Sequence, residues 1–223
     1  MTAPPRPLRL AHRGDWRHAP ENTIEAFLAA LRVPGCDGLE FDVRLSGDGV
    51  PVVIHDETLE RVQGVAGRVD EISAEVLATY GIPTLELVLE TVPRQAFLDV
   101  ELKSELGRAA VDALIAGRGP AFERGIVSSF QAATLERVGR LAPAWPRWLN
   151  THHLESSTIR VAAQIGCQGV FADWHVIDAE KARQVRAAGL ELAAFTVRRR
   201  PTVRRLIELG VVALCLEAAA LDG

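Results

Sequence analysis

The sequence is poor in cysteine and has no two cysteines at short spacing. Its 223 residues include three, Cys36, Cys167 and Cys215, which lie far apart and form no CxxC motif. An odd number of isolated cysteines argues against a disulfide framework and favours reduced thiols, as in a cytoplasmic protein. We therefore predict a cytoplasmic location and interpret each thiol as a packing group.

Long apolar runs and an excess of positive charge are also missing. The N-terminal residues contain no apolar segment of the kind found in a signal peptide, and no later run is long enough to span a bilayer. The formal net charge of −4 offers no long-range attraction to nucleic acid or to an anionic membrane. The short basic run Arg198–Arg200 fits the solvated start of a helix. We predict no nucleic-acid partner and no stable membrane association.

What the sequence does contain is a regular alternation of short apolar runs and amphipathic stretches. With 48% hydrophobic and 24% charged residues, the composition is that of a globular protein, and the length suits one domain over residues 1–223. Strands are expected at Leu8–Ala11, Gly38–Leu45, Pro51–Ile54, Ala96–Leu102, Gly125–Ser129, Arg147–Asn150, Gly169–Ala172, Glu191–Val197 and Val211–Leu216. Helices are expected at about Thr23–Val33, Leu85–Thr91, Leu106–Gly117, Ala132–Leu141, Ser156–Ile165, Asp178–Ala188 and Thr202–Leu209.

This alternation predicts a parallel sheet of the α/β class. About eight βα units closing on themselves give a (β/α)₈ TIM barrel. An open, doubly wound sheet is the alternative, but no GxGxxG motif follows the first strand to support it. The stretch from Glu57 to Pro83 interrupts the alternation with several glycines, and we expect it to form a small insertion over the mouth of the barrel.

Two of the predicted strands carry charge where a barrel interior is normally apolar. Their apolar residues occupy one parity and must face the helices, so the charged parity points into the barrel near its C-terminal mouth. The charged positions are Glu40, Asp42 and Arg44 on the first strand, and Asp99, Glu101 and Lys103 on the second.

Carboxylates gathered in a narrow barrel repel one another and lose hydration, so they need compensation. A hard divalent cation such as Mg²⁺ or Ca²⁺ would supply it, since both prefer oxygen ligands. A network of ion pairs closed by Arg13, Arg44 and Lys103 is the alternative, and the periodicity alone does not decide between the metal site and this network.

His12 and His55 end strands at the same mouth. Because histidine is the usual acid or base near neutral pH, their joint presence favours a catalytic site.

Several motifs together resemble those of the glycerophosphodiester phosphodiesterase family, in its short single-domain bacterial form. In chain order they are His12-Arg13-Gly14, Pro20-Glu21-Asn22-Thr23, Glu40-Phe41-Asp42-Val43, His55-Asp56 and Glu101-Leu102-Lys103. The segments Ile82–Leu85, Ser128–Phe130 and Phe195–Val197 extend the resemblance over most of the chain. Each motif alone is weak, whereas the whole series in register is specific.

The resemblance implies metal-dependent hydrolysis of small glycerophosphodiesters to sn-glycerol 3-phosphate and an alcohol. It implies one divalent metal ion, Mg²⁺ or Ca²⁺. It also implies that one histidine acts as the base and the other as the acid, and either can be the base. The implied ligands are Glu40, Asp42 and Glu101, the implied acid and base are His12 and His55, and the implied phosphate contacts are Arg13 and Lys103. The nucleophile is either water or the neighbouring hydroxyl of the glycerol.

The resemblance also implies roles for further positions. Glu21 and Asn22 orient the metal ligands or cap the following helix, where Asn22 and Glu25 have the spacing of a capping box. Trp174 and His175 follow a strand and line a substrate groove, although Trp174 fits packing equally well.

The C-terminus departs from the family pattern. Cys215-Leu216-Glu217-Ala218 stands where relatives commonly carry a Thr-Asp pair, and Phe195 replaces a common tryptophan in the substrate groove. These departures bear on the shape of substrate that the site accepts and on how the barrel closes, rather than on the reaction.

Three other functions remain as alternatives. A phospholipase C-like enzyme acting on another phosphodiester shares the barrel and the paired histidines, but no membrane-binding element is evident. A metal-dependent nuclease would need a basic groove, which the net charge disfavours. A non-catalytic phosphodiester-binding protein would be expected to have lost at least one of His12, His55 and Glu101, and all three are present.

Overall fold

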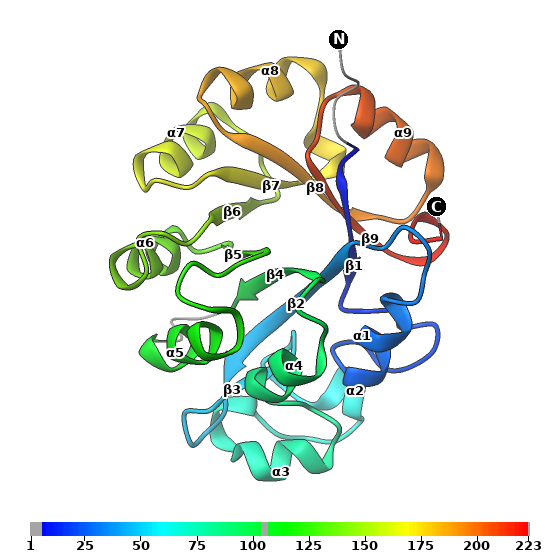
Figure 1. The fold of residues 1–223 in the computed structure, drawn as a ribbon, viewed down its shortest axis with the longest axis vertical. Coiled ribbons are helices and arrows are strands. Elements are labelled where there is room, and N and C mark those ends of the chain that lie inside the picture. The colour runs from blue at the N-terminus through cyan, green and yellow to red at the C-terminus, as the bar shows by residue number, and fades with distance from the viewer. Residues whose placement is uncertain (1–5, 104–106, 223) are drawn as a thin grey trace.

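Eight parallel strands form a closed ring in the computed structural model, which describes residues 6–103 and 107–222 (Figure 1). In the ring β1 pairs with both β2 and β9, so that no edge is left open between them. The ring consists of β1 (Leu8–His12), β2 (Gly38–Leu45), β4 (Phe97–Leu102), β5 (Gly125–Ser129), β6 (Arg147–Thr151), β7 (Gly169–Asp173), β8 (Glu191–Val197) and β9 (Ala213–Leu216). The predicted TIM barrel is confirmed, and the doubly wound sheet is excluded.

Helices surround this ring on its outer side (Figure 1). They are α1 (Ile24–Ala30), α4 (Leu85–Thr91), α5 (Gly107–Arg118), α6 (Ala132–Leu141), α7 (Ser156–Gln164), α8 (Ala179–Ala187) and α9 (Arg200–Glu208). Leu106, where the sequence predicts the fifth helix to start, lies outside the described residues. Within the described part of the chain, no helix combines the length and the apolar character needed to cross a bilayer.

The predicted short strand near Pro51 does not belong to the barrel. β3 (Pro51–Val53) pairs antiparallel with β2 and forms a hairpin that leads into the insertion. The insertion contains α2 (Glu60–Gln63), a 3₁₀ turn η1 (Val69–Glu71) and α3 (Ala74–Thr79). Residues of η1, α3 and β3 share an apolar cluster that is separate from the main core. In Figure 1 this segment lies at the lower edge of the molecule, outside the ring of strands.

Arg61 of the insertion reaches the rim of the barrel. Its guanidinium lies 2.6 Å from a carboxylate oxygen of Glu21 and 2.5 Å from one of Asp56. That residues 57–83 cover the mouth stays a prediction.

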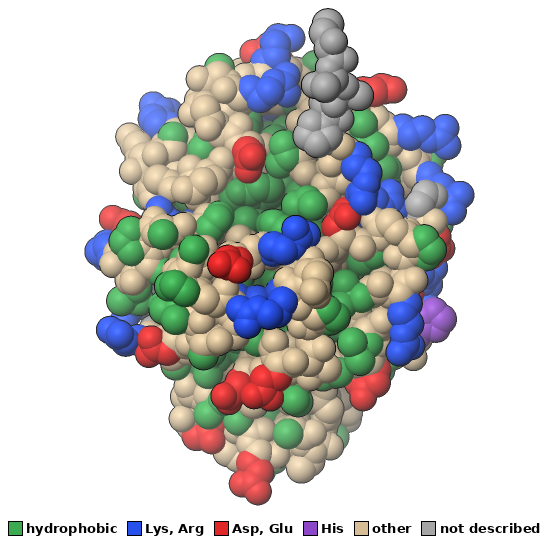
Figure 2. All heavy atoms as spheres, viewed as in Figure 1, with side chains coloured by type: hydrophobic (Ala, Val, Ile, Leu, Met, Phe, Trp, Pro, Cys, Tyr) green, Lys and Arg blue, Asp and Glu red, His purple; other side chains and the backbone are tan. Residues whose placement is uncertain are grey.

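Charged side chains of both signs are interspersed over the face drawn in Figure 2, with no broad basic area among the described residues on that face.

The start of α1 differs from the expected capping box. Thr23 is the N-cap, and its hydroxyl accepts a hydrogen bond from the backbone N–H of Ala26. Asn22 instead adopts a left-handed conformation with φ of 60°, and its side-chain amide donates to Asp42 at 2.9 Å. The prediction that Asn22 caps the helix is therefore wrong, because the amide is turned toward the barrel interior.

The strand register brings the charged residues to two neighbouring levels of the barrel. His12 lies opposite Glu40, Glu40 opposite Asp99, and Asp42 opposite Glu101. These carboxylates are buried, as expected for side chains that point into the barrel. The apolar parity of β2, at Leu39, Phe41 and Val43, is fully buried on the other side of the sheet.

Gly14 permits α1 to lie against the end of β1. Its φ is +84°, and a Cβ at this position would lie 2.7 Å from the carbonyl carbon of Ala26 and 2.8 Å from its Cβ. Only glycine accepts both the left-handed backbone and the close approach of the helix.

We expect Gly14→Ala to destabilise the protein more than Gly49→Ala, as measured by urea unfolding. Both glycines have positive φ, so each substitution costs about 1–2 kcal/mol for the left-handed backbone. At Gly49, with φ of +79°, an added Cβ meets no atom within 4 Å, so this variant controls for the backbone alone. Equal losses of unfolding free energy would contradict the close packing of α1 on Gly14.

Candidate active site

A cavity of about 170 Å³ opens at the C-terminal mouth of the barrel. Residues at the ends of β1, β2 and β4 and in the loop after β3 make its charged side, and residues at the ends of β5 to β8 make its aromatic side. The charged side consists of His12, Arg13, Glu40, His55, Asp99, Glu101 and Lys103. The aromatic side consists of Phe130, His152, Phe171 and Phe195.

His12 is held between two carboxylates. Its Nδ1 contacts Glu217, which directly follows β9, and its Nε2 lies 3.8 Å from Oε2 of Glu40. Burial raises the pKa of Glu217, but the hydrogen bond from His12 and the ion pair with Arg198 outweigh it and lower this pKa to about 2. The ionised Glu217 therefore orients the imidazole and leaves Nε2 toward the interior of the site.

His55 has an equivalent partner in its own loop. Its Nδ1 lies 2.6 Å from Oδ1 of Asp56. Burial lowers the pKa of His55, and the nearby Arg13 and Lys103 lower it further, whereas Asp42 raises it. The net decrease keeps His55 neutral near pH 7, as a proton acceptor must be.

Three carboxylates form the centre of the charged side. Oxygen atoms of Glu40, Asp42 and Glu101 lie within 4.8 Å of one another. Burial and the charge of Asp42 raise the pKa of Glu40 well above its usual range and raise the pKa of Glu101 to about 7. Burial also acts to raise the pKa of Asp42, but Lys103 and Arg13 outweigh it and hold this pKa below its ordinary value. Three converging oxygen donors fit a hard divalent cation.

Two cations already contact this cluster. Lys103 Nζ lies 2.9 Å from Oδ1 of Asp42 and 2.5 Å from Oε1 of Glu101, and Arg13 Nε lies 3.0 Å from Oδ2 of Asp42. Arg44, expected in the alternative ion-pair network, does not join it, because its Nε donates to the backbone carbonyl of His55 at 2.8 Å. The ion pairs therefore do not rule out a metal site, because the two cations neutralise the acidic cluster only in part.

The residues after β1 support these contacts. Arg13 has φ of +57°, an uncommon conformation for a side chain of its size, and such strain often occurs at functional sites. Glu21 accepts a hydrogen bond from Arg13 at 2.9 Å, and Asn22 donates to Asp42. Glu21 and Asn22 therefore orient a cation and a carboxylate of the site.

Asp99 is a fourth buried carboxylate, to which the sequence analysis gave no role. Ser128 Oγ donates to its Oδ1 at 2.6 Å, while Oδ2 has no hydrogen-bond partner among the described residues. Burial raises the pKa of Asp99 to about 8, although the hydrogen bond from Ser128 acts in the opposite direction. Asp99 thus holds a proton at neutral pH, at the level of Glu40.

The aromatic side contains only one of the three residues predicted to line a groove. Phe195 contacts both Phe130 and His152, with ring centroids 5.7 and 5.5 Å apart. Trp174 and His175 lie in the 3₁₀ turn η2 (Trp174–Val176), outside the described lining of the cavity.

The structure shows what Trp174 and His175 contact instead. The Trp174 ring lies under the guanidinium of Arg205, and His175 is exposed and contacts Asp173. That these two side chains line a substrate groove stays a prediction.

Sequence reasoning missed the two carboxylates that orient the histidines, Glu217 beside His12 and Asp56 beside His55. The sequence signal for Glu217 is its place directly after the last strand, and the signal for Asp56 is its place beside His55 in the His55-Asp56 motif. The pairing of Glu217 with His12 spans 205 residues and depends on the closure of the barrel between β1 and β9.

A closed barrel with two oriented histidines and an acidic cluster at its C-terminal mouth belongs to the class of TIM-barrel enzymes. Residues 12–220 match the glycerophosphoryl diester phosphodiesterase family, and the chain belongs to this family. A glycerophosphodiester phosphodiesterase from Caldanaerobacter subterraneus subsp. tengcongensis is 33% identical, over 92% of this chain and 91% of the relative. The predicted family and enzyme class are confirmed.

Solved structures agree with this placement. An Oleispira antarctica phosphodiesterase in complex with the product sn-glycerol-3-phosphate has a TM-score of 0.83 and 26% identity, covering 97% of this chain and 95% of that chain. A glycerophosphodiester phosphodiesterase from Agrobacterium tumefaciens str. C58 has a TM-score of 0.80 and 28% identity, covering 97% and 98%.

We expect the stability of Glu101→Gln relative to wild type to depend on pH in metal-free buffer. The pKa of Glu101 rises from 4.5 to about 7 on folding. The folded state then binds the proton more tightly, so wild type loses unfolding free energy as the pH increases through this window. Urea unfolding in EDTA should show the variant gaining up to about 3 kcal/mol on wild type between these pH values.

Glu86→Gln, on the exposed face of α4, is the matched control and should follow wild type. If Glu101 served only as an ion-pair partner, its loss would leave Lys103 undercompensated. Glu101→Gln would then be less stable than wild type at every pH, which would count against a repulsive cluster.

Proposed function

We propose that the protein hydrolyses glycerophosphodiesters to sn-glycerol 3-phosphate and an alcohol. The observation that carries the proposal is the pair of histidines, each held at Nδ1 by a carboxylate, lining one cavity with the acidic cluster. Family membership supports the substrate class, and so does the product bound to the Oleispira antarctica enzyme.

Glu40, Asp42 and Glu101 are the proposed ligands of one divalent ion, Mg²⁺ or Ca²⁺. Their converging oxygens and the raised pKa values of Glu40 and Glu101 support this assignment. When bound, such an ion acts as a Lewis acid on a phosphoryl oxygen and offsets the charge that develops there.

Arg13 and Lys103 are the proposed contacts of the substrate phosphate. Both line the cavity, and neither cation can lose its charge near neutral pH beside these carboxylates. Fixed N–H donors directed at the phosphoryl oxygens stabilise the negative charge of the transition state.

The two histidines divide the proton transfers. His55, whose pKa is lowered by burial, takes the proton of the nucleophile, which is water or the neighbouring hydroxyl of the glycerol. His12 gives a proton to the departing alkoxide. The ionised Glu217 at its Nδ1 stabilises the positive charge that His12 carries before this transfer.

The aromatic side of the cavity is the proposed site of the alcohol. Phe130 and His152 stack with centroids 4.9 Å apart, and Phe195 closes the group from β8. We also propose that residues 57–83 shape the rim of the mouth, where Arg61 contacts Glu21 and Asp56.

Release of sn-glycerol 3-phosphate from glycerophosphocholine tests the proposed function. We expect turnover by the metal-loaded protein, loss of turnover in EDTA, and recovery when Mg²⁺ or Ca²⁺ is added back, because oxygen ligands bind these ions reversibly. Asp42→Asn should not recover at the same metal concentration. Full turnover in excess EDTA after dialysis would overturn the metal assignment, and no turnover with any divalent ion would overturn the function.

Replacing either His12 or His55 by alanine should lower the rate by a factor of roughly 10²–10⁴, the usual contribution of acid or base catalysis. The double variant should be little worse than the slower single variant, because the two residues act as a unit. His18→Ala is the matched control, since His18 is exposed beside Asp15 and does not line the cavity.

An aryl phosphodiester with a good leaving group assigns the two roles. We expect it to restore much of the rate of His12→Ala, which lacks the acid, and little of the rate of His55→Ala. The opposite pattern would reverse the assignment, and a near-normal rate in either single variant would remove that histidine from the mechanism.

A further inference from the structure

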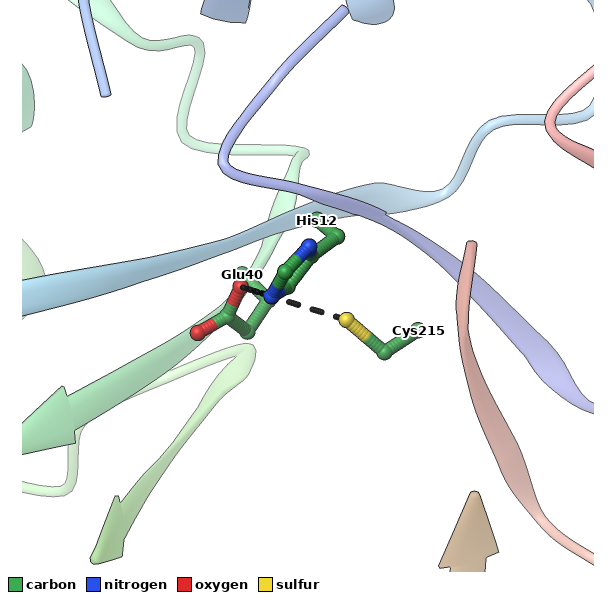
Figure 3. A group of neighbouring side chains, drawn as sticks. All are labelled: His12, Glu40 and Cys215. Carbon is green, nitrogen blue, oxygen red and sulfur yellow. Dashed lines mark hydrogen bonds and ion pairs between the residues drawn. The ribbon is translucent and has the colours of Figure 1, made fainter. Parts of the chain in front are cut away.

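A second group of metal-binding atoms lies beside the acidic cluster. His12, Glu40 and Cys215 come from β1, β2 and β9 and point toward one another (Figure 3). Nε2 of His12 lies 3.8 Å from Oε2 of Glu40, and the Cys215 thiol donates to this oxygen at 3.9 Å. One ligand atom from each of the three lies within 4.8 Å of those from the other two.

This group contains a nitrogen, an oxygen and a sulfur, unlike the all-oxygen cluster of Glu40, Asp42 and Glu101. Zinc binds such ligands tetrahedrally with bonds of about 2.0–2.3 Å, which separates neighbouring ligand atoms by about 3.4–3.6 Å. The separations of 3.8 and 3.9 Å exceed this range by only a few tenths of an ångström, and the third, between His12 and Cys215, is within 4.8 Å, so side-chain rotations close the triangle. Three protein ligands leave the fourth position open toward the cavity.

Cys215 differs from the other cysteines in its surroundings. It lines the cavity, as His12 and Glu40 do. Cys36 contacts the backbone carbonyl of Gly38, and Cys167 packs in the apolar core. Within residues 6–103 and 107–222, Cys215 is the cysteine that has a histidine and a carboxylate at metal-binding distance.

We propose that His12, Glu40 and Cys215 form a second metal site, which takes a borderline or soft divalent cation such as Zn²⁺ or Cd²⁺. Sulfur and imidazole ligands favour these cations over Mg²⁺ and Ca²⁺. On binding, a metal–sulfur bond forms, the S–H bond of Cys215 breaks, and its proton passes to solvent. The thiolate and the Glu40 carboxylate then balance the charge of the ion.

Glu40 belongs to both groups, so the two sites compete. A cation in the second site takes Oε2 of Glu40 from the first and occupies Nε2 of His12. Resting on the proposed function, this makes Zn²⁺ and Cd²⁺ inhibitors that act through Cys215, a residue with no part in the hydrolysis itself.

Titration of metal-free protein with Cd²⁺ tests the site without reference to activity, through the ultraviolet charge-transfer absorption of the cadmium–thiolate bond. We expect the band to saturate at one ion per chain in wild type and in Cys36→Ser/Cys167→Ser, and to be lost in Cys215→Ser. Circular dichroism confirms that each variant is folded. A band that persists in Cys215→Ser would overturn the proposal, and so would its absence from the double variant, which decides the matter even if Cys215→Ser does not fold.

Inhibition of glycerophosphocholine hydrolysis by Zn²⁺ at fixed Mg²⁺ gives the second readout, with each protein normalised to its own uninhibited rate. Even an outer partner of a metal ligand is worth about 10- to 100-fold in affinity, so loss of a direct ligand should raise the inhibitory concentration at least about tenfold. The same inhibitory concentration in wild type and Cys215→Ser would overturn the competition. A cadmium band in a chain that hydrolyses no glycerophosphodiester would support this site and overturn the proposed function alone.

Discussion

Repulsion among buried carboxylates is the constraint on which the rest of the site depends. The register of β1, β2 and β4 places Glu40, Asp42, Asp99 and Glu101 at one end of a narrow barrel, where water cannot screen them. Two cations, Arg13 and Lys103, contact this group of four acids and offset part of its charge. Burial, together with the repulsion among the acids, raises the pKa values of Glu40, Asp99 and Glu101. The protein gives up stability at this point, as enzymes commonly do at a binding site.

Much of the unusual local structure compensates for this imbalance or directs a side chain toward it. The left-handed backbone at Arg13 and Asn22 turns a guanidinium and an amide onto Asp42. Beside these acids the barrel interior is apolar, with Ile126, Trp148 and Phe171 packed together. This packing helps to hold the acids in place.

The sequence was sufficient to predict the barrel and the inward charge, because both follow from a period of two along each strand. It did not distinguish the hairpin strand β3 from a barrel strand, since four apolar residues look alike in either setting. It also placed Trp174 and His175 in the substrate groove, whereas both lie in the 3₁₀ turn η2, outside the described lining of the cavity. Glu217 and Cys215 gain their partners only when β9 closes against β1, and periodicity contains no information about that contact.

In the metal-free protein the acids hold protons, which a divalent cation would displace. Calorimetric titration of Mg²⁺ or Ca²⁺ into metal-free protein, repeated in buffers of different ionisation enthalpy, counts the protons released on binding. At pH 6.5, below the pKa of about 7 for Glu101, the account predicts release of a substantial fraction of a proton or more per ion. Binding without proton release, or no binding at all, would contradict it.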